Sequence, residues 1–500
     1  MDLEAYRERA EEFVAELTGE HYRHFAGLKD EFEIEAIYSR HEDLFTRSAV
    51  EELREQAAAP PPGTDERRRR RMLLDFAVEG HLGQATKALE AELALREAEL
   101  SIEFDGERIG FRESAMTQAN EPDAARRAHI EEARLALTEE ELNPLHREVI
   151  EHHHGLAREL GYPSYRDMCV ALQGLDFDAL HRQTEAFAAA TEASYGTVVE
   201  PELLRTLGIG FDELRRSDLP RFFRDADADT SFPADRLTES FVETVRGLGM
   251  DVTAQPGVIL DTERRPKKSP RAFCAPVHAP GEVYLVIAPV GGHDDFAALF
   301  HEGGHTEHFA NVDPALPFEF RLLGDNAITE AYAFLFQHLT EDPEWLRRRL
   351  GVEDDGALAA YARASRLVFL RRYAAKFAYE LELHGSSDDE LDAGLNAFAD
   401  RYAELLSAAV RVEWPRETFL ADVDPGFYCA AYLRAWALEM HLRRHLRDQF
   451  GPAWFEDPEA GATLRTLWHD GQRLTPEEML RDLTGKRLDF TAMRDEVGIG

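Results

Sequence analysis

Cysteine is scarce in this chain and widely spaced. Only Cys169, Cys274 and Cys429 occur among its 500 residues. A small secreted scaffold needs several paired cysteines, and a thiolate zinc site needs cysteines at short, regular spacing. The sequence therefore excludes a disulfide framework and a cysteine-based zinc site as its organising features.

Long apolar runs are also missing. A membrane-spanning helix needs about 20 consecutive, mainly apolar residues, and no stretch of this chain approaches that length. The first residues, MDLEAYRERAEEF, lack the basic and apolar segments of a secretory signal. We therefore expect a soluble, cytoplasmic protein with no membrane partner.

Basic residues are outnumbered by acidic ones. The chain has 57 lysines and arginines against 96 aspartates and glutamates, which gives a formal net charge of −39. Nucleic-acid binding relies on basic patches, so this composition argues against a nucleic-acid partner. The dense basic run at Arg67–Arg71 has acidic neighbours and continues into a helical pattern. We expect a solvated helix start with internal ion pairs there.

Most of the chain has helical periodicity, and two short regions differ. Ser101–Phe111 alternates around Asp105-Gly106, which predicts a small hairpin. Residues 258–290 are β-branched, aromatic and interrupted by prolines, which predicts a small sheet with a loop at Arg264–Pro270. The fold class that we expect is therefore mainly α.

A metal-ligand motif follows this predicted sheet directly. His301-Glu302-Gly303-Gly304-His305 is an H-E-x-x-H sequence. Residues four apart on a helix lie on one face about 6 Å apart along the axis. His301 and His305 are thus predicted to bind one metal ion, with Glu302 held beside it.

The helix itself is predicted from the residues around the motif. Asp294 and Asp295 supply negative charge to a first turn, after a Gly291-Gly292 break. Gly303 and Gly304 each cost about 1 kcal/mol relative to alanine inside a helix. We therefore expect another backbone, or a substrate, to approach closely at these glycines.

A catalytic zinc ion needs a third protein ligand, and two acidic residues downstream are candidates. Asp325, followed by Asn326, resembles the cap of a new helix whose first turn presents Glu330. We predict Glu330 as the third ligand and Asp325 as a capping or outer residue. Glu307 and Glu319 are alternatives for orienting a ligand imidazole.

The combined motifs resemble a known family. The run PRAFCAPVHAPGEVYLVIAPVGGHDDFAALFHEGGHTEHF, at Pro270–Phe309, is followed by ITEAYA at Ile328–Ala333. Together they are similar to the catalytic core of the thimet oligopeptidase and oligoendopeptidase F family of gluzincin metallopeptidases. The angiotensin-converting-enzyme group is a more distant relative.

The resemblance implies an architecture. Its members have two helical lobes around a deep substrate cleft, with a small sheet beside the zinc helix. Transferred here, a helical lobe is expected over residues 1–250 and a zincin-like catalytic lobe over 251–500. The catalytic lobe would contain the sheet at 258–290, the zinc helix at 294–310, the glutamate helix at 326–340 and the C-terminal helices.

The resemblance also implies substrate contacts. Ala272, Phe273, Cys274 and Ala275 occupy the place of an edge strand that pairs with an extended peptide. Tyr428 and Tyr432 match tyrosines that contact the substrate and the transition state, although both could instead pack in a helix interface. The family carries a histidine in the loop before these tyrosines. This chain has Asp422 and Asp424 near that place.

The function implied is that of a zinc metalloendopeptidase with one Zn²⁺ per chain. Glu302 would act as the general base in the hydrolysis of short peptides. Two alternatives stay open: a zinc carboxypeptidase or dipeptidyl carboxypeptidase, and a non-catalytic protein that binds zinc or peptides. A purely structural zinc site has no need of a base beside its ligands, so Glu302 argues against the last of these.

Overall fold

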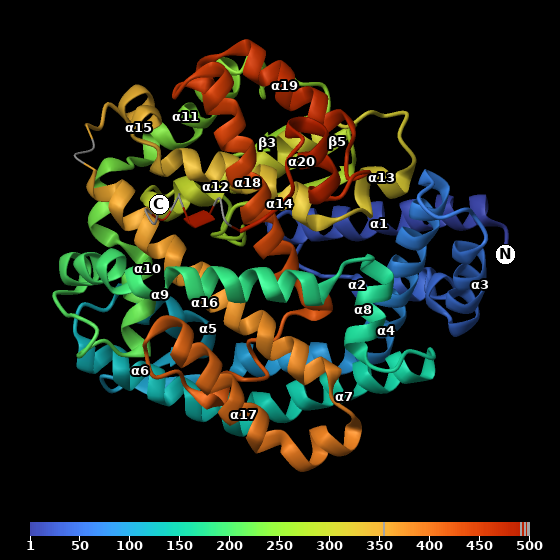
Figure 1. Cartoon of the computed structure of the whole chain (residues 1–500), viewed down its shortest axis with the longest axis horizontal. Helices are drawn as coiled ribbons and strands as arrows, with labels where there is room; N and C mark the ends of the chain where they lie inside the picture. The colour runs from blue at the N-terminus through green and yellow to red at the C-terminus, as the bar shows by residue number, and fades with distance from the viewer. Residues whose placement is uncertain (354–355, 491–492, 495–496, 498–500) are drawn as a thin grey trace. The chain divides into compact units, whose positions relative to one another are not determined.

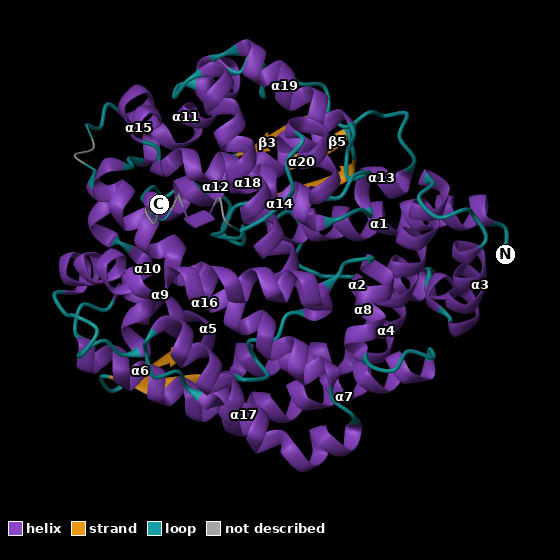
Figure 2. Ribbon diagram, viewed as in Figure 1, coloured by secondary structure: helices purple, strands orange, loops and turns teal. Residues whose placement is uncertain are grey.

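The protein is mainly α-helical, as predicted. The computed structural model describes residues 1–353, 356–490, 493–494 and 497. Helices make up most of the described chain, and the strands form one two-stranded and one three-stranded sheet (Figure 2). No helix within the described residues is both long and apolar enough to cross a membrane.

The chain divides into two compact units, and both are discontinuous in sequence. Unit 1 contains residues 1–81, 228–359 and 434–492, and unit 2 contains 82–227, 360–433 and 493–500. This partition differs from the expected boundary near residue 250. The reason is tertiary packing inside unit 1: α1 (Leu3–Phe25) packs on strand β4, and α19 (Pro458–His469) packs on α12, which bears the H-E-x-x-H motif.

Unit 1 contains the zinc-motif helix and the three-stranded sheet. Figure 1 follows its segments by colour along the chain. Besides α1 and α19, its elements are α2 (Ile34–Arg40), α3 (Arg47–Ala58), the start of α4 (Asp65–Glu99), α11 (Ala234–Gly247), β3 (Val258–Asp261), β4 (Phe273–His278), β5 (Glu282–Val286), α12 (His293–Ala310), α13 (Phe318–Leu322), α14 (Asn326–Gln337), α15 (Pro343–Leu350), most of α18 (Tyr428–Phe450) and α20 (Pro476–Thr484).

The three-stranded sheet has the order β3-β5-β4, so β4 is an edge strand. β5 pairs in parallel with β3 and antiparallel with β4, with Ala275 opposite Tyr284. Val283 and Leu285 are fully buried on β5, while the Tyr22 ring of α1 stacks on the ring of Tyr284 with centroids 3.6 Å apart. The sheet predicted for residues 258–290 is confirmed.

Unit 2 is helical apart from the predicted hairpin. β1 (Ser101–Phe104) pairs antiparallel with β2 (Glu107–Gly110). Asp105 and Gly106 between them both have positive φ, at 54° and 81°, as a two-residue type I′ turn requires. The remaining elements are the rest of α4, α5 (Phe111–Asn120), α6 (Ala124–Leu137), α7 (Asn143–Glu159), α8 (Tyr165–Gln173), α9 (Phe177–Leu207), α10 (Leu219–Arg224), most of α16 (Ala357–Gly385), α17 (Asp388–Val410) and the first turn of α18.

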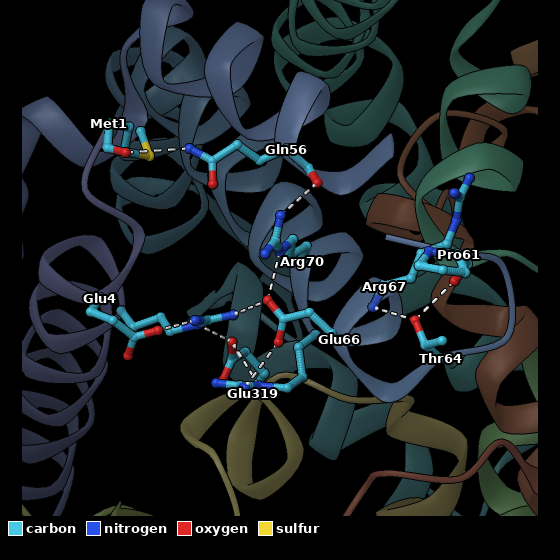
Figure 3. Close-up of polar contacts among 11 residues, drawn as sticks. Met1, Glu4, Gln56, Pro61, Thr64, Glu66, Arg67, Arg70 and Glu319 are labelled. Atoms are coloured by element: carbon cyan, nitrogen blue, oxygen red, sulfur yellow. Dashed lines mark hydrogen bonds and ion pairs between the residues drawn. The ribbon is translucent and has the colours of Figure 1, made fainter. Parts of the chain in front are cut away.

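The arginine run lies at the start of α4 and forms the ion pairs predicted for it. Glu66 accepts a hydrogen bond from Arg70 Nε at 2.6 Å, and Arg69 pairs with both Glu66 and Glu319 (Figure 3). Arg68 pairs with Glu478 at 2.8 Å. These arginines are only partly exposed, so the run joins segments of unit 1 and is less solvated than the sequence suggested.

Candidate metal centre

The zinc-motif helix begins as the sequence predicted. Gly291 and Gly292, with φ of 95° and 92°, precede α12. Glycine adopts such positive φ angles readily, and other residues rarely do. The Asp295 side chain accepts hydrogen bonds from the backbone N–H groups of Val290 and Gly291 at 2.7 and 2.8 Å. The loop before the helix is therefore tied to the first helical turn.

The two glycines of the motif are sites of close approach. A Cβ atom on Gly304 would lie 2.5 Å from the carbonyl oxygen of Tyr332 and 2.7 Å from Cα of Ala333. A Cβ atom on Gly303 would lie 2.2 Å from the Phe241 ring. At Gly304 the neighbour is the backbone of α14. Of the two predicted alternatives, another backbone or a substrate, the backbone is the one found at this glycine. Glycine here lets α14, which carries Glu330, pack directly against α12.

The three predicted ligands lie together. His301 Nε2 is 3.4 Å and His305 Nε2 is 3.9 Å from the same carboxylate oxygen, Oε2 of Glu330. One potential ligand atom from each side chain lies within 4.8 Å of the others. Glu330 is buried, and both imidazoles are partly exposed. Two nitrogens and one oxygen thus lie around a common centre.

Each ligand imidazole is oriented by a neutral side chain of α14. His301 Nδ1 lies 2.9 Å from Oε1 of Gln337, and His305 Nδ1 lies 2.7 Å from Oγ1 of Thr329. The sequence analysis missed both partners. Helical geometry offered a signal, because Thr329 directly precedes Glu330 and Gln337 lies two turns after it on the same face.

The two glutamates proposed as orienting residues do not have that role. Glu307 is fully buried and accepts hydrogen bonds from Gln255 Nε2 at 2.8 Å and from Asn311. Burial raises the pKa of Glu307 to about 7. Glu319 is fully buried and bonds to Arg7 at 2.6 Å (Figure 3). Both predictions were wrong because these carboxylates are engaged with Gln255, Asn311 and Arg7 instead of a ligand imidazole.

Glu302 is held beside the ligands by the edge strand. Its Oε2 accepts a hydrogen bond from the backbone N–H of Cys274 at 2.9 Å. Burial raises the pKa of Glu302 to about 7, although the charge of His301 and the Cys274 hydrogen bond act in the opposite direction. A carboxylate with this pKa can both accept and release a proton near neutral pH.

The two imidazoles differ in their affinity for protons. Burial lowers the pKa of His305 to about 4, helped by the charge of His301. Burial also acts to lower the pKa of His301, but the Glu330 hydrogen bond and the charges of Glu302 and Glu330 outweigh it and raise this pKa. His305 is therefore the neutral imidazole, which is the form that binds metals.

Asp325 caps the helix that carries Glu330, as predicted. Its side chain accepts a hydrogen bond from the backbone N–H of Ala327 at 3.0 Å. The cap is reinforced by Arg434, whose Nη1 lies 2.7 Å from Asp325 Oδ2 and which also pairs with Glu477. Arg434 is only 4% exposed. Asp325 thus fixes the start of α14 and is not part of the ligand group.

The predicted substrate-contact segment coincides with the edge strand. Phe273, Cys274 and Ala275 begin β4, and Ala272 directly precedes the strand. Phe273 and Cys274 are partly exposed, whereas Ala275 is buried. The contact between Cys274 and Glu302 places this strand next to the motif helix. Its role in peptide binding stays a prediction.

Tyr428 and Tyr432 lie in unit 2, at the start of α18. Their rings meet edge to face with centroids 5.0 Å apart, and Tyr432 makes a similar contact with Tyr373 at 5.9 Å. The residues before them, Gly426 and Phe427, both have positive φ, at 61° and 57°. Phe427 is not a glycine, so the turn that leads into Tyr428 is strained.

The two aspartates in the loop before these tyrosines, Asp422 and Asp424, are engaged in ion pairs. Asp422 lies 2.6 Å from Arg372, and Asp424 lies 2.8 Å from Lys376. Burial would raise the pKa of Asp422, but the charges of Arg372 and Lys376 outweigh it and lower this pKa. Ionised carboxylates only accept hydrogen bonds. Asp422 therefore cannot replace a donor to an oxyanion.

Comparison with known proteins adds no assignment. No protein-family model matches this chain, and no curated protein matches it.

Proposed function

We propose that this protein is a zinc-dependent oligoendopeptidase that hydrolyses short, extended peptides. The observation that carries the proposal is the position of Glu302. Its carboxylate follows His301 on the same helix and bonds to the backbone of an edge strand. This arrangement supplies a base and a possible peptide-binding strand beside one group of metal ligands.

The residues present fit a zinc ion. The donor set is two imidazoles and one carboxylate, as in many hydrolytic zinc sites that keep a position for water. Each Nδ1 is already hydrogen-bonded, so each Nε2 is directed at the centre. Zinc, when bound, supplies a Lewis acid that lowers the pKa of water and polarises a carbonyl oxygen.

The chain's own residues would move the proton. Glu302 would accept a proton from the attacking water and deliver it to the leaving amine. The Cys274 N–H group holds one carboxylate oxygen of Glu302 and so limits the rotation of the base. An extended peptide that pairs with β4 would present its carbonyl beside this carboxylate.

The test is paired measurement of zinc and of hydrolysis. Wild type and Glu302→Gln are assayed for metal by elemental analysis, and for cleavage of a blocked fluorogenic peptide. We expect about one zinc in each protein, and a rate about 100- to 10,000-fold lower in the variant because general acid–base catalysis is lost. Equal rates in the two proteins, or a wild type that binds no zinc, would refute the proposal.

Product mapping separates the endopeptidase from the carboxypeptidase alternative. A peptide with an acetylated amino terminus and an amidated carboxyl terminus has no free end for an exopeptidase to recognise. We expect internal cleavage of this peptide. Cleavage that occurs only after the carboxyl terminus is freed would instead indicate a carboxypeptidase or dipeptidyl carboxypeptidase.

A further inference from the structure

The atoms that orient the metal ligands are both uncharged. Zinc-binding histidines commonly donate their second N–H to a carboxylate, a backbone carbonyl or water. Here the partners are the amide oxygen of Gln337, at 2.9 Å, and the hydroxyl oxygen of Thr329, at 2.7 Å. The carboxylates nearest in sequence to these histidines have other roles. Glu302 bonds to β4, and Glu307 bonds to Gln255.

These contacts determine which tautomer each ligand adopts. An amide oxygen only accepts hydrogen bonds, so His301 must carry its proton on Nδ1 to satisfy Gln337. With zinc bound, its Nε2 would then carry the lone pair, on the side of the ring that faces Glu330. The Phe334 ring contacts His301 edge to face at 5.1 Å and fixes the plane of the imidazole. The same logic places the Nε2 lone pair of His305 toward the centre when Thr329 accepts.

The charge of the partner matters as well as its geometry. A carboxylate partner increases the basicity of a ligand imidazole and adds a negative charge near the metal. An amide or a hydroxyl gives the same orientation without that charge. The three ligands, His301, His305 and Glu330, then carry only one negative charge between them, against the two positive charges of the ion.

We propose that Gln337 and Thr329 are positioning residues of the metal site that orient both imidazoles without adding charge. With these uncharged partners, a bound metal ion would be held less tightly than with carboxylate partners. It would also be more electrophilic. This inference rests on the proposed zinc site. It goes further by assigning roles to two residues that touch neither the metal nor the substrate.

The test measures zinc affinity in matched variants. Gln337→Met and Thr329→Val keep the side-chain size and remove the acceptor, whereas Gln337→Glu and Thr329→Ser keep an acceptor. Zinc dissociation constants are measured by competition with a chelator in mildly alkaline buffer, where protons compete little. We expect Gln337→Met and Thr329→Val to bind zinc about 10- to 100-fold more weakly, as is typical for loss of such partners.

The variants that keep an acceptor should not lose zinc affinity. Thr329→Ser should bind zinc as wild type does, and Gln337→Glu should bind it more tightly. Nitrogen NMR of the histidine rings in the metal-free proteins provides a second readout. Wild type should keep a proton on Nδ1 of both His301 and His305, and Gln337→Met should lose this preference at His301 alone.

Each outcome has a separate meaning. A wild type that binds no zinc would refute the proposed function. Zinc binding by wild type with unchanged affinity in Gln337→Met would refute the positioning role and leave the proposed function intact. Weaker zinc binding by Gln337→Glu would refute the charge argument. Steric fit alone would then explain the results for both Gln337→Glu and Gln337→Met. Thermal unfolding of the metal-free variants controls for simple loss of folding.

Discussion

Within the part of the chain that the structure describes, two groups of side chains have the composition of a metal site. His301, His305 and Glu330 form one group, and Glu380, Asp424 and Cys429 form the other. Lys376 lies beside the second group, with its Nζ 2.8 Å from Asp424 and 3.6 Å from Glu380. In the first, the short contacts run between the members themselves. A built-in ammonium thus already supplies positive charge in one group, and in the other a bound metal ion would supply it.

Burial also affects the protonation states of the two groups differently. Burial lowers the pKa of His305 to about 4, which leaves a neutral imidazole ready to bind a metal. Burial raises the pKa of the Cys429 thiol well above its usual value, and the charge of Glu380 raises it further. A thiol is a poor ligand in comparison with a thiolate. Proximity of ligand-type side chains is therefore insufficient, because their charge state and any internal cation decide whether a metal binds.

The largest effect should come from removing a ligand of the first group. His305→Ala is expected to weaken zinc binding by more than about 100-fold, which exceeds the loss typical of outer partners. Peptide hydrolysis should fall with it. The measurement is zinc content after dialysis, together with the rate on a blocked peptide. Cys429→Ser in the second group is the matched control and should keep both properties. Loss of zinc in the control would mean that the roles of the two groups are reversed.

A large loss of stability should follow removal of the internal cation from the second group. Lys376→Met leaves Asp424 without its buried cationic partner, at a cost of up to about 3–5 kcal/mol in unfolding free energy. Denaturant unfolding measures this change. Lys267→Met is the control, because the Lys267–Asp30 pair is exposed and should contribute at most about 1 kcal/mol. Equal losses in the two variants would show that Lys376 contributes no more than a surface ion pair.

A smaller effect should follow from adding a methyl group where α12 packs directly against α14. In Gly304→Ala the new methyl group would press on the backbone at Tyr332 and Ala333, so the helices must separate. Such overpacking costs about 1–3 kcal/mol and should also weaken zinc binding by moving Glu330 away from the histidines. In Gly83→Ala, on α4, a Cβ atom meets nothing within 4 Å. That control should gain up to about 1 kcal/mol. Unchanged zinc affinity in Gly304→Ala would contradict the close-approach argument.

The sequence was informative where local geometry decides the outcome. The spacing of His301 and His305 on one helix, and the cap at Asp325 that places Glu330 in a first turn, depend only on helical periodicity and capping. Gln337 and Thr329 were missed because their role depends on which face of α14 packs against α12. The composition of unit 1 was missed for a related reason: the packing of α1 on β4 is a tertiary contact without a local signal.

A separate effect, spread over several pH units, concerns the ionisation of Glu380. Burial raises its pKa from 4.5 to about 8, although Lys376 acts to lower it. Between these values the folded protein keeps a proton on Glu380 that the unfolded chain has released. Stability should therefore fall as the pH rises through this interval, with a slope of up to about 1.4 kcal/mol per pH unit from this group.

Glu380→Gln tests that assignment, because an amide has no proton to release. The free energy of unfolding, measured at several pH values, should decline less steeply in the variant than in wild type between pH 4.5 and about 8. Glu344→Gln is the contrasting control. The pKa of Glu344 is lowered to about 2 by Arg347 and Arg348, so the slope of stability against pH in that variant should depart from the wild-type slope only below about pH 4.5. Parallel curves for wild type and Glu380→Gln would mean that Glu380 is ionised beside Lys376, and that the second group holds its lysine through a full ion pair.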